Sequence, residues 1–160
     1  MLTTRNIPFG AIALTYPIGI MSADDPKYPP TRTNWKTTYN TEALEVRLSA
    51  LGLRTIKTVG KYNGTSERTF IFERETGQQV YELGKEFGQE AVILALSPDK
   101  HLFLYTNGPN DGKYHPSLAD YHVWQLNEGA PGDNWTLIPG FGYIRINFDW
   151  NTSYHNPLVL

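Results

Sequence analysis

The sequence predicts an α+β protein with an antiparallel β-sheet, and three features of its first two thirds carry this prediction. Two segments, near 34–52 and 76–88, show the apolar spacing of amphipathic helices. Five further segments are rich in β-forming residues. The pair Asn63-Gly64 between two of these segments is a strong signal for a tight β-hairpin. With 160 residues, the chain has the size of one domain.

The first strand and the first helix are predicted from the N-terminal third of the chain. Residues 9–20 predict a buried strand, and the prolines within 24–33 predict a loop. Asn34 is a suitable N-cap for the helix, and Gly52 a suitable end. The apolar face of this helix comprises Leu44, Leu48 and Leu51, widened by Ala43 and Val46.

A hairpin and a second helix follow. Segments 53–62 and 66–74 alternate in polarity and flank the Asn63-Gly64 turn. Thr76 and Gln79 have the spacing of a capping box, which predicts the start of the second helix. In the second strand of the hairpin, Phe70 and Phe72 share one face, and Thr69 and Ile71 the other.

A continuous apolar run in 89–96 predicts a central strand buried on both faces, and 101–106 predicts the strand after it. The order β-α-β-β-α-β is that of a ferredoxin-like split β-α-β sandwich, with two helices on one face of an antiparallel sheet. We therefore expect a single domain over 1–160, with a core at about 7–107. Residues 108–160 are expected to form an irregular wrapping tail with short strands at 121–126 and 143–148.

Composition limits the classes of partner. The formal net charge is −2 and no dense Lys/Arg run occurs, which argues against general nucleic-acid binding. The apolar stretch 7–21 is short and interrupted by Pro and Gly, so no membrane span is expected. The chain has no Cys, and its four His show no metal-ligand spacing. We therefore expect no metal and no cofactor.

Candidate site residues lie in the hairpin and near two helix ends. The hairpin brings Tyr62, Ser66 and Glu67 close to a tight turn; the alternative is a solvated hairpin tip. Arg32 beside Asn34 offers a planar cation at a helix start, where a carboxylate can also meet free N–H groups; the alternative is a capping turn with a surface Arg. Gln89 either contacts an adenine edge or caps the preceding helix.

With these segments in place, the sequence resembles the bacteriophage S-adenosylmethionine lyases, formerly called hydrolases. The resemblance covers about 130 residues in order and at low identity. The segments that carry it are Thr31-Arg32, Gly60-Lys61-Tyr62, Glu67-Arg68-Thr69, Gln89-Glu90-Ala91-Val92-Ile93, Leu104-Tyr105-Thr106-Asn107-Gly108, Glu128-Gly129-Ala130-Pro131, Thr136 and Phe141-Gly142. The portion from the first helix to the second is also shared with a group of uncharacterised bacterial domains.

The resemblance implies a homotrimer with active sites between subunits, located in the cytoplasm of an infected bacterium. It implies cleavage of S-adenosylmethionine to 5′-methylthioadenosine and homoserine lactone, which depletes the host's methyl donor and counters restriction. Glu67 and Tyr62 carry over as catalytic residues, and Arg32, Asn34, Ser66 and Gln89 are expected to bind substrate.

The proposed chemistry needs neither a metal nor an enzymic nucleophile. The substrate's own carboxylate attacks its γ-carbon, and the sulfonium leaves as a neutral thioether, so orientation supplies much of the catalysis. A Glu can hold the substrate ammonium, and a Tyr can hold the conformer or face the sulfonium. Two alternatives stay open: a non-catalytic trimeric module that binds nucleotide or S-adenosylmethionine, and a structural virion protein with an aromatic-rich tail.

Overall fold

The strands form one antiparallel sheet that curls round and closes on itself. The computed structural model describes residues 2–3, 14–23, 35–62, 64–97, 100–129 and 132–155. Eight strands make a closed barrel in the order β7-β6-β5-β2-β4-β3-β8-β9, and β7 pairs with β9 to complete the ring. In chain order the elements are β1 Leu2–Thr3, β2 Ile18–Ser22, α1 Trp35–Ala50, β3 Thr55–Tyr62, β4 Thr65–Glu73, α2 Gly77–Glu86, β5 Ala91–Ser97, β6 Lys100–Tyr105, β7 Lys113–Gln125, the 3-10 turn η2 Leu126–Glu128, β8 Trp135–Ile138, β9 Gly142–Phe148 and β10 Tyr154–His155.

The prediction of a ferredoxin-like sandwich with an irregular C-terminal extension is wrong. The β-α-β-β-α-β order is present, but the sheet does not stop at β3 and β6. Gly60 and Lys61 of β3 pair with Thr136 and Trp135 of β8, and β8 pairs in turn with β9. The segment expected to wrap loosely therefore supplies three barrel strands, because its backbone groups complete the ladders that a sandwich would leave open at its edges.

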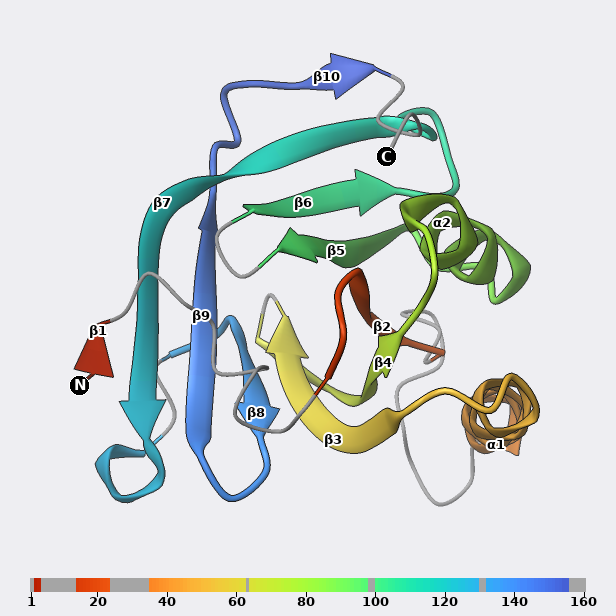
Figure 1. Ribbon diagram of the computed structural model, residues 1–160, viewed down its shortest axis with the longest axis horizontal. Coiled ribbons are helices and arrows are strands. Elements are labelled where there is room, and N and C mark those ends of the chain that lie inside the picture. Colours follow the sequence, from red (N-terminus) through yellow and green to blue (C-terminus); the bar gives the residue numbers. More distant parts are fainter. Residues whose placement is uncertain are drawn as a thin grey trace.

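Figure 1 shows how the last third of the chain closes the barrel. β7 runs alongside β6 and then bends to run beside β9. The short strands β1 and β10 both add to β7 outside the ring of eight. Both helices lie on the same side of the molecule, outside the barrel.

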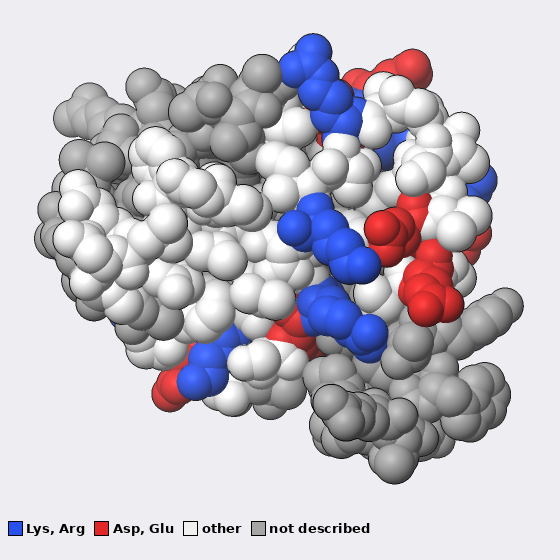
Figure 2. Space-filling model, turned by 90° about the horizontal axis from the view of Figure 1, so that it is seen from below, with Lys and Arg blue, Asp and Glu red and all other residues white. Residues whose placement is uncertain are grey.

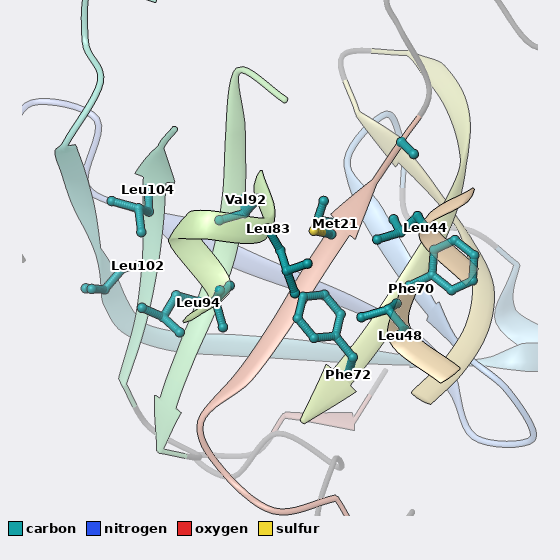
Figure 3. Close-up of a cluster of buried hydrophobic side chains, with 12 residues drawn as sticks. Met21, Leu44, Leu48, Phe70, Phe72, Leu83, Val92, Leu94, Leu102 and Leu104 are labelled. Atoms are coloured by element: carbon teal, nitrogen blue, oxygen red, sulfur yellow. The ribbon is translucent and has the colours of Figure 1, made fainter. Parts of the chain in front are cut away.

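Successive side chains along each strand point to opposite faces of the sheet, so the sheet lies between two apolar clusters. On β4, Phe70 and Phe72 face outward to the helices, and Ile71 faces the barrel interior. The outer cluster lies between the helices and the sheet (Figure 3), and it includes Met21, Leu44, Leu48, Leu83, Val92, Leu94, Leu102 and Leu104. The interior cluster comprises Leu14, Ile18, Ile20, Ile71, Ala95, Ile138 and Ile144. The barrel is thus filled by aliphatic side chains through its middle.

Helix α2 begins as the sequence predicts. The Gln79 N–H donates to Thr76 Oγ1 (3.4 Å), and the Thr76 N–H donates to Gln79 Oε1 (3.1 Å), which completes the capping box. Gly84 then lets the helix lie close to the sheet, since an added Cβ would be 2.7 Å from side-chain atoms of Thr106 and Val92.

Helix α1 differs from its prediction in one respect. Leu44 and Leu48 are buried, and Gly52 follows the helix at φ +70°, as expected. Val46, expected to widen the apolar face, is 68% exposed. The outer cluster therefore receives a narrower stripe of α1 than the sequence suggests.

Candidate functional site

One end of the barrel carries the β3–β4 hairpin, and we call it the hairpin end. Because neighbouring strands run antiparallel, β4, β5, β7 and β8 start at this end, and β2, β3, β6 and β9 finish there. Interior side chains near these strand limits therefore face a common region of the barrel, although they come from segments far apart in the sequence.

Glu67 faces the interior at the hairpin end. It lies four residues before the interior Ile71 on β4, so the two side chains share a face, and it pairs across the ladder with Gly60. Glu67 is half-buried. Glu67 lies near the start of β4, close to the hairpin turn, and it faces the inside of the barrel. Its expected catalytic role stays a prediction.

Four interior hydroxyl residues lie near Glu67, and we call them the hydroxyl band: Ser22, Thr58, Thr69 and Thr136. Thr69 pairs with Ser22 on one side and with Thr58 on the other. All four are buried, with exposed fractions of 8% or less. Thr58 Oγ1 donates to the Leu137 carbonyl (2.8 Å), and Thr69 Oγ1 donates to the Glu67 carbonyl (3.2 Å). The wall beside Glu67 is thus polar, in contrast to the aliphatic middle of the barrel.

The facing part of the hairpin end is aromatic. Five rings pack together here, and we call them the aromatic wall. They come from β6, from the start of β7, from the last residue of β9 and from the position two residues after β9: Phe103, Tyr105, His115, Phe148 and Trp150. Phe103 lies at the centre, with ring centroids 4.9 Å from Trp150 and 5.4 Å from Tyr105. Most of these contacts are edge-to-face, the arrangement that aromatic quadrupoles favour.

Hydrogen bonds fix His115 within the wall. Its Nδ1 lies 2.7 Å from the Thr152 carbonyl, which can only accept, so Nδ1 carries the proton. In the neutral ring Nε2 then accepts from Tyr105 Oη at 3.2 Å. Burial, helped by the negative charge of Glu90, raises the pKa of Tyr105 above its ordinary value, so its phenol stays a donor at neutral pH. The imidazole therefore joins β6, β7 and the segment after β9.

The other predicted site residues have different positions. Ser66 is exposed and lies on the opposite face of β4 from Glu67, so the structure does not bring these two side chains together. Its expected contact with substrate stays a prediction. Tyr62 ends β3 and pairs with Thr65, at the hairpin end, but its side chain lies outside what the structure describes. Arg32 and Asn34 lie outside the described residues.

Gln89 lies two residues before β5, also at the hairpin end. Its N–H donates to the Gly84 carbonyl (2.9 Å), and its own carbonyl accepts from Thr106 Oγ1 (2.5 Å) and Asn107 Nδ2 (2.7 Å). The backbone of Gln89 thus fastens the end of α2 to the end of β6. This fits the capping alternative for the residue better than contact with an adenine edge.

Charged residues on the outside of the barrel are largely matched by opposite charges. On the outer face of β3, Lys57 Nζ lies 2.9 Å from Glu45, and Lys61 Nζ lies 3.6 Å from Asp133. The face seen in Figure 2 carries a row of Lys and Arg side chains with Asp and Glu side chains beside it. Among the described residues, the interior of the hairpin end, which carries both Glu67 and the aromatic wall, is chemically the more specific feature.

A polar cluster beside α2 has a structural role. Asp111 accepts a hydrogen bond from Tyr81 Oη (2.5 Å) and is paired with Lys85, whose Nζ also donates to the Thr106 carbonyl (3.3 Å). Hydrogen bonds from Lys85 and then Tyr81 hold the pKa of Asp111 below its ordinary value. These contacts fasten the loop after β6 to α2.

Within the described ranges, no group of three or more His, Asp or Glu residues is arranged to hold a metal ion. Neither of the described α-helices is both long and apolar enough to cross a membrane.

The sequence interpretation missed the aromatic wall. Its signal is the alternation His101, Phe103, Tyr105 on one face of β6, and His115 on the paired face of β7. That signal can be read only if 113–117 is recognised as a strand. A proline within a segment is unfavourable for a strand, but the carbonyl of Pro116 accepts from the Asp149 N–H (2.8 Å), so this segment can still form a strand.

No protein-family model matches the sequence, and no curated protein is significantly similar to it. Support for a function therefore comes from the geometry of the hairpin end and from the resemblance seen in the sequence.

Proposed function

We propose that this chain binds S-adenosylmethionine at the hairpin end of its barrel and cleaves it to 5′-methylthioadenosine and homoserine lactone. The observation that carries the proposal is the inward-facing, half-buried Glu67 at the same end of the barrel as the aromatic wall. S-adenosylmethionine combines a cationic amino-acid part with a flat ring, and these two groups call for a carboxylate and an aromatic surface.

The fold itself does not support the lyase family, because the closed barrel replaces the ferredoxin-like sandwich that the resemblance implied. Support comes from the hairpin residues and from the chemistry of the interior. An eight-stranded barrel is wide enough to hold one small ligand, provided that the side chains at one end leave room.

The reaction requires one bond to form and one to break. A carboxylate oxygen of the substrate forms a bond to its own γ-carbon while the bond from that carbon to sulfur breaks. The electron pair of the broken bond stays on sulfur, which loses its positive charge, and methylthioadenosine leaves as a neutral molecule. No proton transfer is needed before the lactone is released.

In this proposal the protein acts by holding the substrate. The Glu67 carboxylate binds the substrate ammonium and so turns the substrate's own carboxylate toward the γ-carbon. Buried hydroxyls of Ser22 and Thr136 line the wall beside it. Holding reacting groups in contact geometry can lower a barrier by about 7–11 kcal/mol. Tyr62, at the same end of the barrel, stays a predicted second contact to the substrate.

The proposal is tested by incubating the purified chain with S-adenosylmethionine, without added metal, and separating the products by liquid chromatography. We expect methylthioadenosine to accumulate in proportion to enzyme and time, with homoserine lactone or its hydrolysis product in equal amount. A heat-denatured sample gives the background of spontaneous breakdown. Turnover no faster than that background at high enzyme concentration would overturn the enzymatic proposal.

The closed barrel also favours a second candidate, a non-catalytic module that sequesters a nucleotide or S-adenosylmethionine. A closed eight-stranded barrel is a common container for a single small ligand. Calorimetry separates the two candidates, because the module must bind stoichiometrically and release intact ligand on denaturation, whereas the lyase returns products.

A homotrimer in the cytoplasm of an infected bacterium stays a prediction. Several exposed apolar side chains on the barrel support self-association, among them Val59, Leu118 and Tyr154, with exposed fractions of 42%, 46% and 50%. Multi-angle light scattering at micromolar concentration tests it, and a stable monomer would contradict the trimer. Glu67 and the aromatic wall belong to one chain, so a monomer would leave the proposed site intact.

A further inference from the structure

We infer that the aromatic wall is the binding surface for a flat heteroaromatic ring, with Trp150 as the platform on which that ring stacks. The inference rests on the proposed function only for the identity of the ring, which would be the adenine of S-adenosylmethionine. The wall itself is part of the described structure whether or not the chain is an enzyme.

Trp150 is exposed despite its contacts. It packs against Phe103 (4.9 Å), His115 (5.1 Å) and Phe148 (5.5 Å), yet 57% of its surface is accessible. An indole that is held by three neighbouring rings and still more than half exposed can offer aromatic surface to a ligand. Tryptophan in such a position adds contact area at a small cost in conformational entropy.

The support behind Trp150 is rigid. Phe148 is 8% exposed and lies 5.6 Å from Phe103, so it fills the space beneath. His115 is held through Nδ1 by the Thr152 carbonyl, two residues after Trp150 in the chain, and through Nε2 by Tyr105. The orientation of the segment that carries Trp150 is therefore set before any ligand binds, which reduces the entropy lost on binding.

A stacked ring fits this wall better than an enclosed cation. A cage for a sulfonium needs several ring faces turned toward one empty centre. Here the rings meet mostly edge-to-face, with Phe103 centroids 4.9–5.6 Å from Trp150, Tyr105 and Phe148, so they fill the centre themselves. The open surface that is left is a single platform, and the carboxylate at this end of the barrel is already present to meet positive charge.

Calorimetry with two partial ligands tests the inference. Adenosine carries the ring without the cation, and S-methylmethionine carries the cation without the ring. We expect adenosine to bind the intact chain, and Trp150→Ala to weaken that binding by about 10- to 100-fold, the range seen for loss of one base-stacking aromatic. Binding of S-methylmethionine should change less than twofold.

Tyr154→Ala is the matched control. Tyr154 is a similarly exposed aromatic (50%), but it packs on Tyr114, which lies on the outer face of the barrel. Its loss should leave adenosine binding within twofold of the parent. Trp150→Phe keeps an aromatic ring at this position, although a smaller one. It should therefore restore part of the adenosine affinity that Trp150→Ala loses. Partial recovery would show that the loss in Trp150→Ala comes from the missing ring and not from a general defect in folding.

Three results would overturn the inference: no adenosine binding by the parent at millimolar concentration, unchanged adenosine binding in Trp150→Ala, or loss of S-methylmethionine binding alone. Because the readout is binding without turnover, it is separable from the proposed function. A chain that binds adenosine through Trp150 but does not cleave S-adenosylmethionine keeps the inference and loses the lyase. A chain whose Trp150→Ala variant cleaves S-adenosylmethionine with an unchanged KM keeps the lyase and loses the inference.

Discussion

The two ends of β4 each carry an interior glutamate, and the barrel treats them differently. Glu73, at the end opposite the hairpin, is 8% exposed. Its carboxylate accepts hydrogen bonds from the backbone N–H groups of Thr15 and Arg54, the latter at 3.0 Å. Glu67, at the hairpin end, is half-buried beside the hydroxyl band, and it shares that end with an exposed Trp150.

The difference separates a structural carboxylate from a candidate functional one. Glu73 joins the segment before β2 and the segment before β3 to the end of β4, so folding itself supplies its partners. Burial acts to raise the pKa of Glu73, but the two backbone hydrogen bonds and the positive charge of Arg54 outweigh burial and hold the pKa below its ordinary value. The same residue type on the same face of one strand is thus placed in two different environments, and the proposed function assigns a role in substrate binding only to Glu67.

The largest effect on stability is expected from Glu73→Gln. The substitution keeps the shape but removes the charge and one acceptor oxygen, so the two N–H groups that bind the carboxylate are less well satisfied. Hydrogen bonds to a charged group contribute about 1.5–3 kcal/mol, and we expect a loss of this size in the free energy of unfolding. Urea denaturation at pH 7 measures it. A loss below about 0.5 kcal/mol in the free energy of unfolding would show that Glu73 contributes little to stability, and the contrast between Glu73 and Glu67 would then fail.

Glu67→Gln should produce the opposite pattern. If Glu67 binds the substrate ammonium, removing its charge lowers turnover of S-adenosylmethionine by about 10- to 100-fold. The free energy of unfolding should change by less than about 1 kcal/mol, because the substitution preserves shape at a half-buried position. Product formation and urea denaturation of the same preparation check both halves. Full activity in a folded Glu67→Gln protein would exclude Glu67 from the site.

The pH dependence of stability offers a smaller and independent test. The lowered pKa of Glu73 means that its contribution is complete above the ordinary glutamate pKa of 4.5. That contribution is lost as the pH falls through the lower pKa of the folded state. The parent should therefore lose stability on acidification more steeply than Glu73→Gln does. Denaturation midpoints at pH 6, 4 and 3 test this, and parallel curves for the two proteins would contradict it.

The smallest effect is expected from Ser66→Ala. Ser66 neighbours Glu67 in sequence but is exposed on the outer face of β4. We expect both activity and stability to stay within experimental error of the parent, or within about 0.5 kcal/mol. A marked loss of activity would indicate that substrate binds outside the barrel, and the difference between the two ends of β4 would then have no bearing on function.

Local features of the fold could be predicted from the sequence because they depend on near neighbours. The Thr76 capping box forms, Gly64 adopts φ +79° in the hairpin turn, and Phe72 and Ile71 lie on opposite faces as expected. The apolar run in 89–96 does form a central strand, between β2 and β6. The capping box, the hairpin turn and the alternation of faces are determined within a few residues along the chain, and the strand at 89–96 is indicated by its own apolar run.

Closure of the barrel could not be predicted in the same way. It depends on pairing between β3 and β8 and between β7 and β9. A strand was expected at 121–126, but the first half of β7 was not, because Pro116 and polar residues interrupt its pattern. Long-range pairing also decides the composition of the candidate site. Glu67 was identified from the hairpin, whereas His115 and Trp150 are placed at the same end of the barrel by the pairing of β7 with β6 and β9. The hairpin half of the site was therefore accessible to sequence reasoning, and the aromatic half was not.

The long-range ladder between β3 and β8 has a consequence for how the chain folds during synthesis. The strands from β2 to β6 can pair as soon as they emerge, but Gly60 must wait for Thr136. Until then, the far side of β3 is an open strand edge that carries the exposed Val59, and such edges recruit other chains. Lys57 and Lys61 lie on this strand, and charged residues on an edge discourage that pairing. The same lysines that form surface ion pairs in the finished barrel thus protect the nascent chain from aggregation before the barrel closes.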